Sequence, residues 1–204
     1  MVDFTLTDEQ VALREMAHEF AEKEIRPVAW EYDKDGTWPQ AILEKAWELG
    51  LMNSHIPEQY GGPGVSYLEG CLIEEELSWG CSGIATSIGA NGLATAPLAL
   101  AGSEELKAKY LGMLTEAPLF AAFCLTEPDA GSDVSGMRTT AVRKGDKWVI
   151  NGSKCFITNG GYADFFTVYA KTDKEKGHRG ISAFIVPKDD TVTVDKKEDK
   201  LGQR

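Results

Sequence analysis

Several residue patterns that mark particular protein classes are scarce or missing in this chain of 204 residues. It has 3 histidines and 4 cysteines, and no two cysteines form a CxxC pair. Zinc and iron–sulfur sites are built from clusters of these residues, so a metal site is not expected. We interpret the cysteines as buried thiols in a reducing compartment, in preference to catalytic nucleophiles: Cys71, Cys81, Cys124 and Cys155.

An excess of basic residues is also missing, because the net charge is −11. Proteins that bind duplex nucleic acid usually carry basic patches, so no nucleic-acid partner is expected. No apolar run has the length of a membrane-spanning helix, and the start MVDFTLTDEQ resembles neither a signal peptide nor a transit peptide. We therefore expect a bacterial cytoplasmic protein, with the mitochondrial matrix as the alternative location.

What is present is the composition of a globular domain with a core, with 43% hydrophobic and 26% charged residues. The first half has helical signals. Thr7 and Gln10 have the spacing of a capping box, Pro27 is expected to kink or end the first helix, and Gly50 to stop the next one. The predicted inward faces of these two helices are Leu13, Met16, Ala17 and Phe20, then Leu43, Ala46 and Trp47.

Two further helical regions follow. Ser66 and Glu69 form a second capping box, and the helix after them is expected to run to about Gly80. Residues 82–101 are rich in Ala and Gly, which favours a closely packed helix. Ser103 caps a last helix whose predicted inward residues are Leu106, Tyr110, Met113 and Leu114.

The apolar pattern becomes strand-like near Pro118. Predicted strands are residues 119–125, 139–143, 147–150, 156–158, 167–172, 181–186 and 192–194, with a turn at 144–146 and a hairpin at Asn151-Gly152. The fold class is therefore α+β, with an all-α domain at 1–117 followed by a small β domain at 118–204.

One turn has the composition of an anion site. In CLTEPDAGSD, residues 124–133, an expected strand runs into a Gly/Ser turn whose consecutive N–H groups could hold phosphate oxygens. An ordinary polar surface turn is the favoured interpretation from residue types alone. The sequence has no GxxxxGK[ST] loop and no GxGxxG fingerprint between a strand and a helix.

A second segment, NGSKCFITNGG at residues 151–161, places an aromatic ring and a hydroxyl close together. If Phe156 to Thr158 is a strand, then Phe156 and Thr158 share one face and could border a flat ring with polar edges. The alternative is a half-buried hairpin strand.

Together these segments resemble the acyl-CoA dehydrogenase family, and most closely its medium-chain members. CLTEPDAGSDVSG matches the family's first signature, and NGSKCFITNGG matches its NGxKxWITN segment, with Phe156 where Trp is common. The resemblance also takes in IPEQYGG, EEELSWGCSG and LAGSEELKAKYLGML, and it extends from Phe4 to LGQR. It implies a β-barrel-like middle domain that is incomplete here, and the absence of the family's C-terminal four-helix bundle.

The resemblance implies FAD as cofactor. Thr126 and its neighbours would contact the pyrimidine side of the flavin, Ser132 the pyrophosphate, Phe156 the isoalloxazine, and Thr158 the N5/O4 edge. The full set of implied FAD residues is Phe123, Leu125, Thr126, Gly131, Ser132, Phe156, Ile157 and Thr158. Hydrogen-bond donors at that edge would stabilise charge arriving with the hydride.

The implied substrate is a fatty acyl-CoA, with Ser132, Lys176, His178 and Arg179 near it. The implied reaction is α,β-dehydrogenation to trans-2-enoyl-CoA in fatty acid β-oxidation, with electrons passed to an electron-transferring flavoprotein. The family's base lies in the missing domain, so no catalytic residue is named, and residues 1–204 alone are expected to be inactive. A homotetramer is implied for the full-length enzyme. Two alternatives stay open: an acyl-CoA oxidase that passes electrons to oxygen, and a non-catalytic fragment that binds acyl-CoA or a protein.

Overall fold

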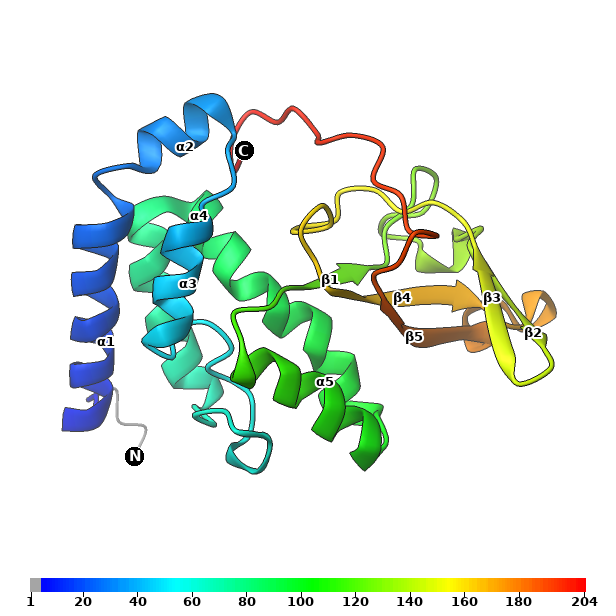
Figure 1. Cartoon of the computed structure of the whole chain (residues 1–204), viewed down its shortest axis with the longest axis horizontal. Helices are drawn as coiled ribbons and strands as arrows, with labels where there is room; N and C mark the ends of the chain where they lie inside the picture. The colour runs from blue at the N-terminus through cyan, green and yellow to red at the C-terminus, as the bar shows by residue number, and fades with distance from the viewer. Residues whose placement is uncertain (1–4) are drawn as a thin grey trace. The chain divides into compact units, whose positions relative to one another are not determined.

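The computed structural model describes residues 5–204, so the first four residues of the stretch MVDFTLTDEQ lie outside it. Seven helical elements come first (Figure 1): α1 (Asp8–Phe20), a π-helical turn η1 (Ala21–Ile25), α2 (Ala29–Asp35), α3 (Gln40–Glu48), a 3-10 turn η2 (Glu58–Tyr60), α4 (Tyr67–Ala101) and α5 (Glu104–Glu116). Both predicted capping boxes are confirmed by reciprocal side-chain bonds, as is the Ser103 cap on Leu106 N–H.

Strands follow: β1 (Ala121–Cys124), β2 (Thr140–Lys144), β3 (Lys147–Asn151), β4 (Phe165–Lys171) and β5 (Ile181–Pro187), with 3-10 turns η3 (Val134–Gly136) and η4 (Lys174–Gly180). The α+β class is confirmed. The chain divides into a helical unit (the chain up to Gly92, Ser103–Pro118 and Glu198–Arg204) and a sheet unit (Leu93–Gly102 and Leu119–Lys197). The domain boundary at 117/118 stays a prediction.

Strand β4 organises the sheet. Antiparallel β5 pairs along its whole length, so β1 and β2 share its other edge, both parallel to it. β1 pairs with Phe165–Val168, and β2 joins at Lys171. The chain between β1 and β2 therefore leaves the sheet at one point of this edge and returns beside it. β3 completes the sheet as the hairpin partner of β2, with Gly145 at φ +66° in the turn.

Several local predictions are wrong. Residues 156–158 and 192–194 are not strands. Asn151-Gly152 is no hairpin turn, because the next strand, β4, begins only at Phe165 and pairs with β1, β2 and β5 and not with β3. Leu106 is 40% exposed and does not face the core. Among the cysteines only Cys124 is buried; Cys71 is exposed, and the other two are intermediate.

The longest helix, α4, corrects the expectation that no apolar stretch is long enough to span a membrane. By length and composition, α4 could cross a membrane, and it is the single helix among residues 5–204 that meets both criteria. Its backbone is extended at Cys81 (φ −165°, ψ 116°), which divides it into two helices near the predicted limit at Gly80. The first part carries three consecutive glutamates, and the two parts bury Ile73, Leu77, Ile84 and Ile88. We assign α4 to the core of a folded protein.

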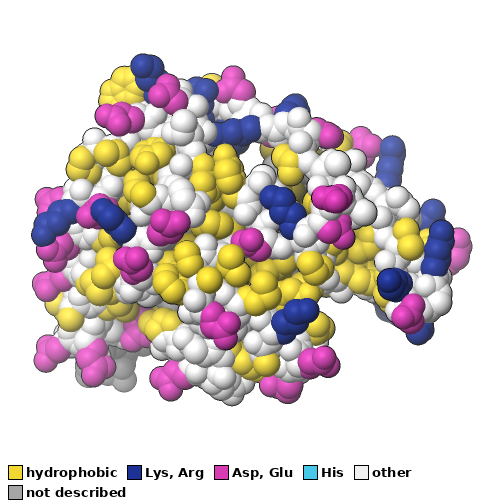
Figure 2. Space-filling model, in the orientation of Figure 1, with side chains coloured by type: hydrophobic (Ala, Val, Ile, Leu, Met, Phe, Trp, Pro, Cys, Tyr) yellow, Lys and Arg dark blue, Asp and Glu magenta, His cyan; other side chains and the backbone are white. Residues whose placement is uncertain are grey.

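Charge is unevenly distributed over the surface. Figure 2 shows many acidic side chains with a few basic ones across the helical unit, and basic side chains beside acidic ones at the end of the sheet unit that carries the β2–β3 hairpin. That hairpin contributes Arg143, Lys144 and Lys147. A ligand with negative charge therefore finds its partners more readily on the sheet unit.

Candidate functional site

The segment after β1, residues 125–133, is a closed turn built by its own backbone. Glu127 and Ala130 exchange two backbone hydrogen bonds of 3.0 and 3.1 Å. Asp133 then accepts from Ser135 N–H at 3.1 Å and opens η3. Between these two closures Gly131 and Ser132 are exposed. The turn thus presents the Gly-Ser backbone outward, as an anion-binding turn requires.

Gly131 in this turn has open space around it. A Cβ built there would meet no atom within 4 Å, and its φ is not in the left-handed region. Nothing in the fold therefore requires glycine at this position. A side chain there would obstruct only an approaching ligand.

The second segment, residues 152–161, lies against this turn. Cys155 N–H donates to Thr126 O at 3.0 Å. Phe156 follows with φ +55° and a side chain that is 70% exposed. A left-handed conformation is rare for a bulky residue, and such strain is concentrated at functional sites. An exposed ring held in this way is a suitable platform for a flat ligand.

The predicted FAD residues fall into two groups. Ile157 packs against the core cluster of Ala122, Cys124, Ala163 and Phe166. The Phe123 ring meets the Tyr169 ring edge-on, with centroids 5.3 Å apart. These two side chains are occupied by packing and could offer a ligand chiefly their backbone. Thr158, Phe156, Gly131 and Ser132 are exposed, and Thr126 and Leu125 are half-buried.

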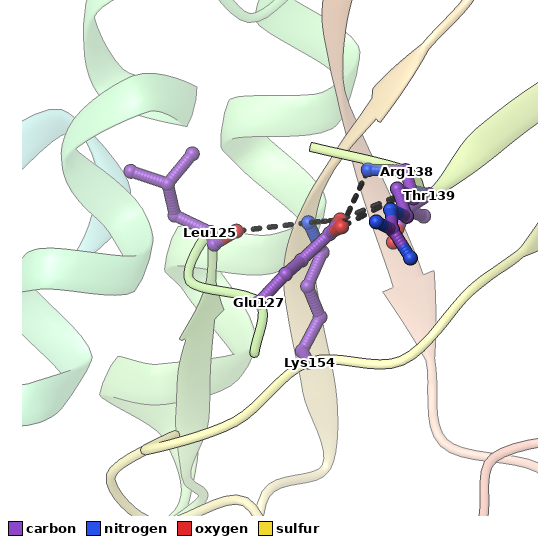
Figure 3. A network of polar contacts seen from close by, with 5 residues as sticks. All are labelled: Leu125, Glu127, Arg138, Thr139 and Lys154. Carbon is purple, nitrogen blue, oxygen red and sulfur yellow. Dashed lines mark hydrogen bonds and ion pairs between the residues drawn. The ribbon is translucent and has the colours of Figure 1, made fainter. Parts of the chain in front are cut away.

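An ion pair between the two segments was not predicted. Lys154 Nζ lies 2.8 Å from Glu127 Oε1 and donates to Leu125 O at 2.9 Å (Figure 3). The Glu127 carboxylate also accepts from Arg138 N–H at 2.5 Å and Thr139 N–H at 3.1 Å. The two charged side chains are only 10% and 5% exposed. Three separate segments of the sheet unit therefore meet at one carboxylate.

The electrostatics of this network are those of a charged pair. Burial by itself would raise the pKa of the Glu127 carboxyl, but hydrogen bonds from Arg138 N–H, Lys154 and Thr139 outweigh it and lower the pKa to about 2. Glu127 is therefore ionised at neutral pH. One sequence signal could have identified Lys154: it is the single charged residue in NGSKCFITNGG.

The backbone beside this network is tightly packed. A Cβ on Gly152 would lie 2.1 Å from Thr139 Oγ1, closer than any real contact. Glycine is therefore required where the chain leaves β3. Its role is close approach, and not the hairpin turn that the sequence predicted.

Three of the four predicted substrate residues, Lys176, His178 and Arg179, lie in a loop closed at its neck, and the fourth, Ser132, lies in the turn after β1. Thr172 N–H donates to Gly180 O at 2.8 Å. Lys176 pairs with Asp173 at 3.0 Å, and its side chain is 67% exposed. His178 and Arg179 are exposed, and Gly177 between these basic residues has φ +53°. The loop therefore displays three cationic or titratable side chains that a phosphate could contact.

The other histidines have structural surroundings. Burial lowers the pKa of His55, which keeps its ring neutral. It borders a cavity of about 150 Å³ in the helical unit, with Glu74, Gly89 and Gly92 among the lining residues. His18 Nδ1 lies 2.7 Å from Glu76 Oε2, and its ring lies against the Trp79 ring at a tilt of 31°, with centroids 4.5 Å apart. Among residues 5–204 no group of three or more His, Cys, Asp or Glu could hold a metal ion.

Comparison with known families decides the classification. Residues 7–117 match the acyl-CoA dehydrogenase N-terminal domain, and residues 122–204 match the acyl-CoA dehydrogenase middle domain. The chain belongs to the acyl-CoA dehydrogenase family. Members of this family are oxidoreductases, and the turn and the 152–161 segment described above both lie within its middle domain.

Individual similar proteins agree with this. The chain is 44% identical, over its whole length and 51% of the relative, to a probable medium-chain specific acyl-CoA dehydrogenase of Caenorhabditis briggsae described as mitochondrial. A chain from the structure "Electron transferring flavoprotein of Acidaminococcus fermentans: Towards a mechanism of flavin-based electron bifurcation" is 45% identical, with a TM-score of 0.94 over 99% of this chain and 54% of that one.

A Bacillus anthracis acyl-CoA dehydrogenase solved in complex with FAD is 35% identical, with a TM-score of 0.89 over all of this chain and 35% of that one. The chain thus spans about half the length of the first two relatives, and less of the third.

Proposed function

We propose that the chain is the part of an FAD-dependent acyl-CoA dehydrogenase that holds one side of the flavin. The observation that carries this is Phe156, an exposed aromatic ring on a left-handed backbone, next to a turn with an open Gly-Ser backbone. A flat ligand with an anionic diphosphate fits both features. The FAD complex of the Bacillus anthracis relative supports this choice of ligand.

FAD would supply the hydride acceptor, and the chain would position it. Thr158 and the half-buried Thr126 would donate hydrogen bonds to the polar edge of the flavin, where negative charge develops during the reaction. Ser132 and the Gly131 backbone would hold the diphosphate. Phe156 would cover one face of the ring system and exclude water from it.

The proposed reaction is the α,β-dehydrogenation of a fatty acyl-CoA to trans-2-enoyl-CoA in β-oxidation. Ser132, Lys176, His178 and Arg179 would contact the substrate, the last three through phosphate oxygens. We assign no catalytic base to this chain, and we expect residues 1–204 alone to show no dehydrogenase activity. An electron-transferring flavoprotein is the proposed acceptor, in keeping with the Acidaminococcus fermentans relative.

Three further assignments belong to the same proposal. The full-length enzyme would be a homotetramer, and its helical and β domains would meet at residues 117/118. A bacterial cytoplasmic location is proposed first. The mitochondrial matrix is the second candidate, because the Caenorhabditis briggsae relative is described as mitochondrial.

Gly131→Ala and Thr158→Val test the flavin site. Neither is expected to disturb folding, because a Cβ at 131 meets no atom within 4 Å and Thr158 is exposed. FAD is titrated into the wild-type and variant chains, and binding is followed by quenching of flavin fluorescence. Weaker binding in both variants, with unchanged melting temperatures, is expected. Wild-type binding that neither variant weakens would refute these residue roles, and no wild-type binding would refute FAD binding by the isolated chain.

The reaction itself is tested with protein from the complete coding sequence. Acyl-CoA should bleach the flavin without oxygen, and an electron-transferring flavoprotein should restore its colour. Hydrogen peroxide formed in air at the same rate would identify an oxidase. Acyl-CoA binding without bleaching would identify a non-catalytic binding protein.

A further inference from the structure

The ion pair of Lys154 and Glu127 lies where the two proposed flavin segments meet. Glu127 belongs to the turn after β1, and Lys154 immediately precedes Cys155 and Phe156. The backbones touch through Cys155 N–H and Thr126 O, 3.0 Å apart. Lys154 adds a second bond, to Leu125 O at 2.9 Å. Two neighbouring carbonyls of the turn are therefore held by two neighbouring residues of the other segment.

The carboxylate extends this clamp to a third segment. Besides Lys154, Glu127 accepts from Arg138 N–H and Thr139 N–H, the residues just before β2. Because β2 is a strand of the sheet, these amides are a fixed support. The ammonium of Lys154 is thus tied through one carboxylate to the sheet framework, as the dashed lines of Figure 3 show.

Because the Lys154–Glu127 pair is buried, each charged side chain depends on the other. With side chains 10% and 5% exposed, water cannot replace a missing partner. A buried carboxylate that lost the ammonium would have to move toward solvent or take up a proton. Either change would release Leu125, Thr126 and Phe156 from their present positions.

We propose that Lys154 is a positioning residue of the flavin site, which acts through Glu127 and Leu125 O. It holds residues 125–127 and 154–158 in one arrangement before the ligand arrives. This inference rests on the proposed flavin site for its consequence, but the clamp itself can be measured in the ligand-free chain. Lys154 needs no contact with the flavin for this role.

The first experiment measures the clamp without ligand. Lys154→Met keeps the length of the side chain and removes its charge, and Lys144→Met is the matched control on the exposed β2–β3 hairpin. In Lys154→Met, amide hydrogen exchange at Cys155, Arg138 and Thr139 should be about tenfold faster or more, as expected when a charged hydrogen bond is lost. Exchange at these amides should be unchanged in Lys144→Met. Equal rates in both variants would refute the clamp.

The second experiment measures the effect of the clamp on FAD binding. FAD binding should weaken by about tenfold or more in Lys154→Met, and Lys154→Arg, which keeps the charge, should recover part of it. A merely structural lysine would lower the melting temperature but leave FAD affinity unchanged at temperatures where the variant is folded, and that result would overturn the positioning role.

Two outcomes separate this inference from the proposed function. If the wild-type chain does not bind FAD, the flavin site fails, while the exchange rates still decide the clamp. If Lys154→Met does not fold, the double variant Glu127→Gln/Lys154→Met removes both charges and takes its place in both experiments. FAD affinity in that variant equal to wild type would overturn the positioning role.

Discussion

Two ion pairs, one in each unit, use charged side chains in opposite ways. In the helical unit, Lys23 pairs with Glu19 one turn away, and the two side chains are 64% and 63% exposed. In the sheet unit, Lys154 pairs with Glu127 across 27 residues of sequence, and both are nearly buried. Exposed pairs contribute little to stability, whereas removal of one partner from a buried pair is costly. The first pair lies on the surface of one helix, whereas the second joins separate segments of the sheet unit.

The largest expected effect is that of removing one charge from the buried pair. Lys154→Met should lower the free energy of unfolding of the sheet unit by about 3–5 kcal/mol, because it leaves a buried carboxylate uncompensated. Lys23→Met in the helical unit should cause no measurable change. Urea unfolding followed by near-UV circular dichroism checks both. Similar losses in the two variants would contradict the comparison.

A second effect concerns pH. The pKa of Glu127 in the folded chain is about 2, below its ordinary value of 4.5. The contribution of the ionised Glu127 carboxylate to folding stability is therefore fully present above pH 4.5 and is lost as the pH falls from 4.5 toward 2. It amounts to about 3 kcal/mol at most.

Wild type and Glu127→Gln are compared by urea unfolding at several pH values from about 7 to about 2, a range that spans the titration of Glu127. Their difference in stability should shrink as the pH falls. A difference that stays constant would mean that Glu127 does not titrate in the native state as proposed.

The third prediction compares one substitution in both units. Gly152→Ala should destabilise the sheet unit by about 1–3 kcal/mol, because the new Cβ overlaps Thr139 Oγ1. Gly112→Ala in α5 meets no atom within 4 Å and should stabilise the helical unit by about 1 kcal/mol. Thermal unfolding measures the change in stability for each variant. A Gly152→Ala variant as stable as wild type would show that the backbone relaxes easily there.

The smallest expected effect concerns the N-terminal cap of α5 in the helical unit. Ser103 accepts from Leu106 N–H at 3.3 Å and caps α5. Ser103→Ala should cost about 1 kcal/mol. Ser78→Ala, at an exposed position within α4, serves as control and should cost nothing. An equal loss at both positions would assign the effect to the serine side chain in general and not to the cap.

The same contrast explains what the sequence could predict. The capping boxes at Thr7 and Ser66 depend on residues three apart, so their signals are local and both predictions hold. The break of α4 near Gly80 was also visible in the sequence. The family signatures located the turn and the 152–161 segment.

Long-range packing set the features that were missed. Phe156 to Thr158 alternates like a strand, but Cys155 N–H bonds to Thr126 O and the backbone of Phe156 is left-handed, so the segment is not a strand. Asn151-Gly152 has the composition of a hairpin turn, yet its glycine serves close approach to Thr139. No local pattern pairs Lys154 with a carboxylate 27 residues earlier.

The parallel pairing of β1 with β4 has a consequence during synthesis. Ala121 cannot meet its partner Phe165 until more than forty further residues have been made, which takes roughly 2–9 s at about 5–20 residues per second. Lys154 also leaves the ribosome well after Glu127, so the nascent turn stays without its ammonium partner for part of that interval. The order of translation thus leaves β1 and the turn after it without their later partners, Phe165–Val168 and Lys154, for several seconds of synthesis.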